Sequence, residues 1–464
     1  MKTHHRLIIA SSLLLFAAVV PAVGQEANAN PFIKKDVGKA PLKPPGAAFH
    51  DVFEYISIPS DVLNPWLEQH PVTEDAGELR KQVQVWITEN KASVLHTLFT
   101  SGSVNRDAKN QNIVEQIYPT EFMPAPAPET WLLPSAFETR NTGITAESSE
   151  DANGEGRISA ETEWVNMLEP SLCYHSPTAA TRQPGDMFMP HFWNFKVSQL
   201  DAAVAPAYVD PFGIDRQEKL RRWPSFAPGR TYLAGRVNLP AQDEAAVKSS
   251  LLVFFRGTID AAPVPAAEKA EKAPAEHRIS AQVLEMPQAE FSSWLLEQEP
   301  QAAASAAWAF ASGRGTVAVD LSSIGRKGMR TDVWQIEEYI YPTEYEPAKD
   351  KTAKPEIPST PTAFVTRNLG NSLTTVLSED ARGLFLEAEV EGVAKLSDTV
   401  MRRTQTARSE WIPDMIMPLF SSRVFSSTVR PQRGKWMLAA SGPVFSPMGQ
   451  PVMEKVSLVF LKVD

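Results

Sequence analysis

Two stretches of this chain start with the same pattern, a strand-like run followed by a short helix. Residues 52–59 (Val-Phe-Glu-Tyr-Ile-Ser-Ile-Pro) are rich in β-branched and aromatic residues and end at a proline, and residues 60–69 then follow a helical pattern. Residues 279–287 and 288–298 repeat this order. The pattern predicts one strand and one short helix at the start of each of two similar regions.

Later runs in each region alternate between apolar and polar residues with a period of two. This pattern, seen in residues 158–163 and 384–389, is typical of strands with one buried face. Each region ends on a continuous apolar run, residues 250–255 and 457–461. We therefore expect an α+β fold dominated by β structure, in which each region carries a strand and helix followed by antiparallel strands.

Two longer motifs recur in the same order and at nearly constant spacing. Residues 117–122 (Ile-Tyr-Pro-Thr-Glu-Phe) return as 340–345 (Ile-Tyr-Pro-Thr-Glu-Tyr), and residues 136–143 (Ala-Phe-Glu-Thr-Arg-Asn-Thr-Gly) return as 363–370 (Ala-Phe-Val-Thr-Arg-Asn-Leu-Gly). Self-similarity at a fixed period is the signature of an internal repeat. The sequence therefore predicts two tandem repeats of one module.

Composition places the boundaries of these modules. Residues 1–24 have a cationic start and a short apolar stretch, which predicts a secretory signal peptide. Residues 25–48 resemble a flexible leader, and residues 261–277 form a linker rich in Ala, Pro, Glu and Lys. The modules are then residues 49–260 and 278–464. We expect an exported protein without a transmembrane helix, located in the periplasm, at the outer membrane or outside the cell.

Charge and cysteine content narrow the range of partners. The 464 residues carry 55 acidic and 45 basic side chains, a formal net charge of −10 that disfavours nucleic acid as a partner. The chain has one cysteine, Cys173, so it cannot form an internal disulfide. Self-assembly or binding to other envelope proteins is the partner class that we expect.

No motif in the chain carries a catalytic signature. None of the eight histidines recurs in the other module, as duplicated histidine chemistry would require. The acidic run at residues 151–155 loses its alternate oxygen ligands in the second module, which favours a hairpin turn over a calcium loop. We therefore expect a non-enzymatic protein without cofactor or metal.

Six residues are weak candidates for ligand binding: Arg140, Asn141, Arg367, Asn368, Phe192 and Trp193. The arginines could anchor a carboxylate, and the aromatic pair could form a stacking surface for sugars. The alternative is structural. Each arginine would then bridge to the glutamate of its Tyr-Pro-Thr-Glu motif, Glu121 or Glu344, and the aromatic run would be buried.

The order of motifs resembles the C-terminal β-rich module of bacterial secretins. The matching segments of the second module are residues 361–370, 384–390, 420–424 (Phe-Ser-Ser-Arg-Val) and 433–436, and those of the first are 136–143, 158–163, 192–197 and 229–233. The arrangement is similar to secretin-like envelope proteins of planctomycete and verrucomicrobial type. The chain departs from the family in lacking the secretin signature boxes, the glycine-rich gate hairpins and the preceding ring-building domains.

This resemblance implies a scaffold or assembly component of the cell envelope that acts by pairing of sheet edges. A protein that binds glycans or another extracellular ligand is the first alternative. A hydrolase that uses two carboxylates is the second.

Overall fold

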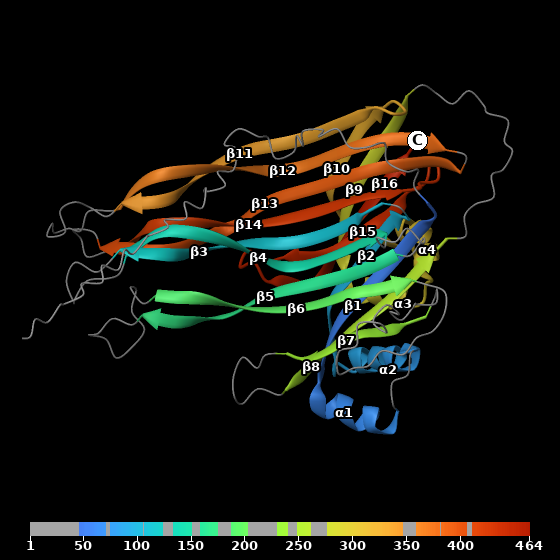
Figure 1. The fold of residues 1–464 in the computed structure, drawn as a ribbon, viewed down its shortest axis with the longest axis horizontal. Helices are drawn as coiled ribbons and strands as arrows, with labels where there is room; N and C mark the ends of the chain where they lie inside the picture. Colours follow the sequence, from blue (N-terminus) through green and yellow to red (C-terminus); the bar gives the residue numbers. More distant parts are fainter. Residues whose placement is uncertain are drawn as a thin grey trace, which may run out of the picture. The chain divides into compact units, whose positions relative to one another are not determined.

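The computed structural model describes twelve segments of the chain (Figure 1): residues 46–70, 75–104, 106–123, 133–150, 158–174, 187–202, 230–239, 248–260, 276–346, 359–380, 382–405 and 411–464. All of them belong to one compact unit, Leu42–Asp464. The expected signal peptide, most of the leader and linker, the 151–155 turn and residues 208–227 lie outside the described residues.

The described residues form two successive sets of elements, which we call the first and the second half of the chain. The first half contains β1 (Ala48–Pro59), α1 (Ser60–Gln69), α2 (Gly77–Thr88), β2 (Ser93–Ser103), β3 (Ala108–Met123), β4 (Leu133–Glu150), β5 (Ile158–Tyr174), β6 (Met187–Ala202), β7 (Tyr232–Asn238) and β8 (Ser249–Ile259). The second half contains β9 (His277–Pro287), α3 (Gln288–Leu296), α4 (Pro300–Ala311), β10 (Thr316–Gly325), β11 (Arg330–Glu346), β12 (Thr360–Asp380), β13 (Gly383–Gln405), β14 (Trp411–Val429), β15 (Met437–Phe445) and β16 (Pro451–Val463). The expectation of a β-dominated fold is confirmed.

The strands form two antiparallel sheets of eight strands each (Figure 1). Sheet A has the order β10-β9-β16-β15-β2-β1-β8-β7, and sheet B has the order β11-β12-β13-β14-β3-β4-β5-β6. Each half therefore contributes four neighbouring strands to each sheet. The two predicted modules share both sheets, and β9 starts at the last residue of the expected linker.

The inner strands of sheet A, such as β1 and β8, are buried on both faces, which explains their nearly continuous apolar runs. In β1, Phe49 and Phe53 pack in a core with Ile144 of sheet B. Ile56, from the opposite face of the same strand, packs in a core with Leu63 and Trp86 of helices α1 and α2. Sheet A is therefore the middle layer between the helices and sheet B.

Irregularities in strand pairing fall at matching motifs of the two halves. The β3–β4 register shifts around Glu121, and the β11–β12 register shifts around Glu344, the glutamates of the two Tyr-Pro-Thr-Glu motifs. Gly143 and Gly370 both have positive φ, 115° and 131°. Both copies of these motifs thus share a register shift and a glycine with positive φ.

Among the described residues, no helix combines the length and the apolar composition that crossing a membrane requires.

Candidate functional site

The two halves meet along a line that we call the central seam, where β15 lies beside β2 in sheet A and β14 lies beside β3 in sheet B. In sheet B the seam is a regular ladder of seven residue pairs, from Phe420↔Glu115 to Ser426↔Lys109. In sheet A a single pair, Ala440↔Thr100, joins the two strands. The halves are therefore joined edge to edge in both layers.

In sheet A, side-chain hydrogen bonds join β15 and β2 where a regular backbone ladder is absent. The buried Ser441 hydroxyl accepts a hydrogen bond from the Phe99 amide at 2.8 Å and donates to the Thr97 carbonyl at 2.9 Å. The Asn110 amide group donates to the Ser441 carbonyl at 2.8 Å, and Ser101 Oγ donates to the Leu438 carbonyl at 3.0 Å. These bonds satisfy buried backbone groups that would otherwise be costly to leave unpaired.

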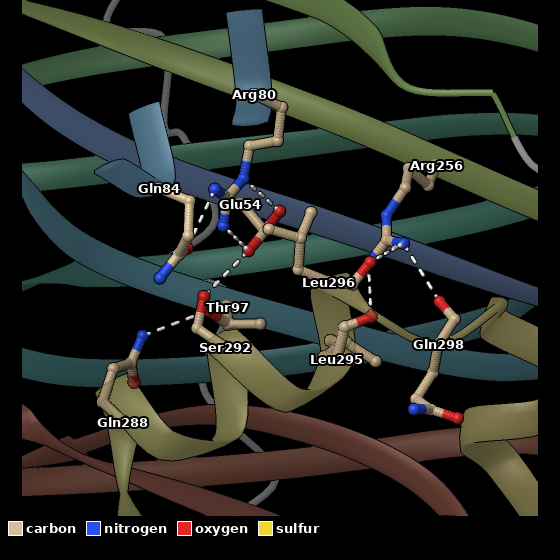
Figure 2. Close-up of polar contacts among 10 residues, drawn as sticks. All are labelled: Glu54, Arg80, Gln84, Thr97, Arg256, Gln288, Ser292, Leu295, Leu296 and Gln298. Atoms are coloured by element: carbon tan, nitrogen blue, oxygen red, sulfur yellow. Dashed lines mark hydrogen bonds and ion pairs between the residues drawn. The ribbon is translucent and has the colours of Figure 1, made fainter. Parts of the chain in front are cut away.

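A buried polar network reinforces the seam on the helical face of sheet A (Figure 2). Arg80 of α2 forms a bidentate pair with Glu54 of β1, at 2.9 Å for Nε to Oε2 and 2.8 Å for Nη2 to Oε1. Ser292 of α3, in the second half, donates to Glu54 Oε1 at 2.9 Å. Burial raises the pKa of Glu54, but the charges and hydrogen bonds of Arg80, Arg256 and Ser292 outweigh it and lower that pKa.

Arg256 of β8 holds the carboxyl end of helix α3 (Figure 2). Its guanidinium donates to the carbonyl oxygens of Leu295 at 2.8 Å and Gln298 at 3.1 Å. A cation is favourable at this end of a helix because the last carbonyl groups lack helical partners. Gln288, at the start of α3, donates to Thr97 Oγ1 of β2 at 3.2 Å. Both ends of α3 are thus fastened to the first half.

Two buried titratable groups lie between the sheets. Asp51 accepts a hydrogen bond from Ser148 of sheet B at 2.8 Å, and burial raises its pKa to about 7 despite that bond. His96 is surrounded by Tyr55 and Trp164, and burial lowers its pKa to about 3. His96 is therefore neutral at physiological pH, and its environment is that of a core residue.

The predicted ligand-binding arginines have different surroundings. Arg367 pairs with the partly buried Glu115 of β3, in the other half of the chain. The structural alternative of a bridge from Arg367 to Glu344 is therefore wrong, because the β12 side chain reaches across the sheet to the first half. Asn368 is half-buried on β12, and Arg140 and Asn141 are exposed on β4.

The predicted aromatic pair lies on a third strand, β6. Phe192 and Trp193 are half-buried, and Trp193 stacks on Phe195 with a ring separation of 6.1 Å and contacts Trp164 edge-on at 5.3 Å. Trp193 thus packs against the core between the sheets. The six candidate residues are spread over strands β4, β6 and β12, and no geometry in the described part of the chain gathers them around one ligand.

The seam residues were missed in the sequence analysis, although one signal was present. Glu54 is a charged residue inside the apolar run 52–59, where an unpaired carboxylate would be costly to bury. Its partners Arg80 and Ser292 lie far away in sequence, and no local pattern identifies them.

The outermost strands of each sheet provide further candidate surfaces, which we call the free edges. One free edge consists of β10 and β11, and the other of β7 and β6. Outside a single pair between Glu344 of β11 and Ala136 of β4, no described strand pairs with their outer sides. Large apolar side chains are exposed along the β10/β11 edge and its connection: Val317, Ile324, Met329, Trp334 and Ile340.

Within the described segments, no cluster of three or more His, Cys, Asp or Glu side chains is arranged to hold a metal ion. The arrangement at the seam and the free edges is suited to pairing between strands.

Comparisons with known proteins find only distant likeness, to solved structures. No protein-family model matches the chain, and no curated protein matches it. The chain is similar to the InvG secretin domain beta-barrel from the Salmonella SPI-1 injectisome NC-base, with 10% sequence identity and a TM-score of 0.18, over 50% of this chain and 73% of that one. A likeness this distant carries no conclusion about the function of the chain.

Proposed function

We propose that this protein is an exported, non-enzymatic structural component of the cell envelope that assembles through its sheet edges. One observation carries the proposal. Both sheets continue across the central seam by edge pairing and then end in the free edges β10/β11 and β7/β6. An unpaired edge strand presents a row of backbone donors and acceptors to which another strand can add.

The proposal includes the internal duplication predicted from the motifs. Its support is the equal order of elements in the two halves and the equal order of their strands in both sheets. The β7–β8 register shifts between Leu233 and Gly235, and the β15–β16 register shifts between Leu438 and Ala440. In this proposal the central seam is a contact between two copies of one module.

The secretin relationship and the export route belong to the same proposal. They rest on the motif order and on the signal-like residues 1–24. The glycan-binding alternative has no comparable support, because Trp193 packs in the core and the six candidate residues lie on separate strands.

Light scattering of the purified chain from residue 25 onward tests the proposal. Across a concentration series, we expect the mean mass to rise from that of one chain to that of several, because edge pairing is a bimolecular contact. A mass that stays at one chain throughout, combined with quenching of tryptophan fluorescence by added sugars, would reject assembly in favour of ligand binding.

A further inference from the structure

We propose that the partner of each free edge is the opposite free edge of a second copy of this chain, in a head-to-tail contact that reproduces the central seam. The inference rests on the proposed function and makes it specific, since it names the partner, the strands and their register. Strands β6 and β7 of one copy would pair with β11 and β10 of the next.

Because both halves have the same strand order, each strand at a free edge corresponds to a strand at the seam. In each sheet the four strands of the second half follow the same order as those of the first. Strands β14 and β15 therefore correspond to β6 and β7, and strands β3 and β2 correspond to β11 and β10. One copy thus already contains the proposed contact once, between its own halves. It carries the two corresponding sides at its ends, where the only pair in the described residues joins Glu344 of β11 to Ala136 of β4.

At the seam, strand edges of sheet A and sheet B lie one above the other, and the same is true at the free edges. At one end, a side chain added to Gly235 of β7 would come within 2.7 Å of Phe195 of β6. At the other end, Val319 of β10 and Val333 of β11 pack against one core that contains residues of both sheets. The edges of the two sheets thus lie one above the other at both ends, as they do at the seam, and both layers can pair at once.

The apolar residues of the β11/β12 end fit this contact. At the seam, Ile117 of β3 and Phe137 of β4 pack on a core that contains Met415 and Met417 of β14. The residues at the same motif positions in the second half are Ile340 and Phe364, which are 63% and 57% exposed.

Strand β6 of a second copy would lie beside these residues, and its sequence resembles that of β14 at the seam. Residues 187–192 of β6 read Met-Phe-Met-Pro-His-Phe, where residues 415–420 of β14 read Met-Ile-Met-Pro-Leu-Phe. The positions of Met415 and Met417 are thus occupied by Met187 and Met189. A second copy placed on the seam register would bring strand β6 beside the exposed Ile340 and Phe364.

The register follows from the seam ladder, in which Ser422 lies opposite Ile113 and Val424 lies opposite Gln111. The equivalent pairs are Asn194 opposite Ile336 and Lys196 opposite Trp334. Lys196 is exposed, and Trp334 is 53% exposed. An ammonium group facing an indole ring is a favourable cation–π pair. The contact is heterologous, so an open assembly keeps one free β10/β11 edge and one free β7/β6 edge at its two ends. It therefore either closes into a ring or grows as a filament.

Mixed disulfide formation between two single-cysteine chains tests the contact directly. Both chains carry Cys173→Ser, and one also carries Asn194→Cys while the other carries Ile336→Cys. Under a mild oxidant, we expect covalent dimers in the mixture and none in either chain alone, because the two positions face each other only between opposite edges. A single chain with Ile113→Cys and Ser422→Cys is the internal positive control, and Ser305→Cys on the exposed face of α4, mixed with Ile336→Cys, is the negative control.

Light scattering of the same samples before oxidation separates the possible failures. Particles of several chains without the mixed dimer would overturn the head-to-tail register and leave assembly standing. Dimers of the Asn194→Cys chain with itself would show a symmetric β6–β6 contact and would also overturn it. Single chains at every concentration would overturn both this contact and the proposed function.

Discussion

Two glycines at matching motif positions have backbone conformations that favour glycine over other residues. Gly143 and Gly370 have φ values that L side chains rarely adopt, and a Cβ at Gly370 would overlap the carbonyl oxygen of Gln335 on β11. We expect Gly370→Ala to lower the free energy of unfolding by about 3 kcal/mol or more, from backbone strain and overlap together. Chemical denaturation measures the loss. Gly313→Ala is the control, since a Cβ there meets no atom within 4 Å, and an equal effect of both substitutions would contradict this explanation.

The buried carboxyl of Asp51 should make stability depend on pH. Burial raises its pKa from 3.8 to about 7, so between these values the folded state holds a proton that the unfolded state releases. This contribution to stability is complete below pH 3.8 and is lost as the pH rises to about 7. His96 acts in the opposite direction, because its pKa is lowered from 6.5 to about 3 and it destabilises the fold as the pH falls below 6.5.

The substitution Asp51→Asn isolates the first of these effects, since asparagine keeps an oxygen that can accept the Ser148 hydrogen bond. We expect the variant to gain stability relative to the wild type as the pH rises from about 4 to about 7, by at most about 1.4 kcal/mol per pH unit, and the gain to stay constant above pH 8. Unfolding curves at pH 5, 6, 7 and 8 provide the comparison. A difference between variant and wild type that does not change with pH would show that Asp51 is already ionised in the folded state at pH 5.

Single residues were the hardest part of the site to predict from the sequence. Arg367 was recognised as a recurring polar residue, but its partner Glu115 lies in the other half, where no local pattern points to it. Glu54 lies inside a predicted strand, and its role depends on Arg80 of a helix and Ser292 of the other half. Periodicity places residues on faces of elements, whereas partner choice follows from long-range packing.

At the scale of elements, the seam in sheet A depends on side chains more than on a strand ladder. Ser441 bonds both the Phe99 amide and the Thr97 carbonyl. Ser441→Ala leaves these buried groups unpaired, and we expect it to cost about 1–3 kcal/mol of unfolding free energy. Thermal or chemical unfolding measures the loss. Ser305→Ala on the exposed face of α4 should change stability by about 0.5 kcal/mol or less, and a similarly small effect of Ser441→Ala would mean that the seam does not depend on this residue.

Elements were easier to predict than their arrangement. The run at residues 52–59 and its following helix correspond to β1 and α1, and residues 279–287 and 288–298 correspond to β9 and α3. The alternating runs correspond to parts of β5 and β13. The strand order of the sheets was not predicted, because edge pairing between β14 and β3 joins residues about 300 positions apart and leaves no periodic trace in the sequence.

At the scale of the whole molecule, the exposed Trp334 should control assembly. Its position on the β11 edge places it opposite Lys196 of a second copy, so Trp334→Lys would set two ammonium groups against each other and remove the indole ring. We expect this variant to keep the unfolding midpoint of the wild type and to require at least a tenfold higher concentration for the same mean mass in light scattering. Met448→Lys, at a side chain that is 75% exposed in a turn, is the control. Equal losses in both variants would indicate nonspecific apolar association.

Hydrogen–deuterium exchange at low and high protein concentration tests the central claim most directly, because it reports which strand edges gain hydrogen bonds on assembly. Backbone amides on the outer sides of β6, β7, β10 and β11 should exchange fast in dilute protein and become protected together as the concentration rises. Amides of the seam strands β2, β3, β14 and β15 should be protected at both concentrations. Exchange at the four edge strands that is independent of concentration, or protection confined to helices α1 to α4, would contradict assembly through the sheet edges.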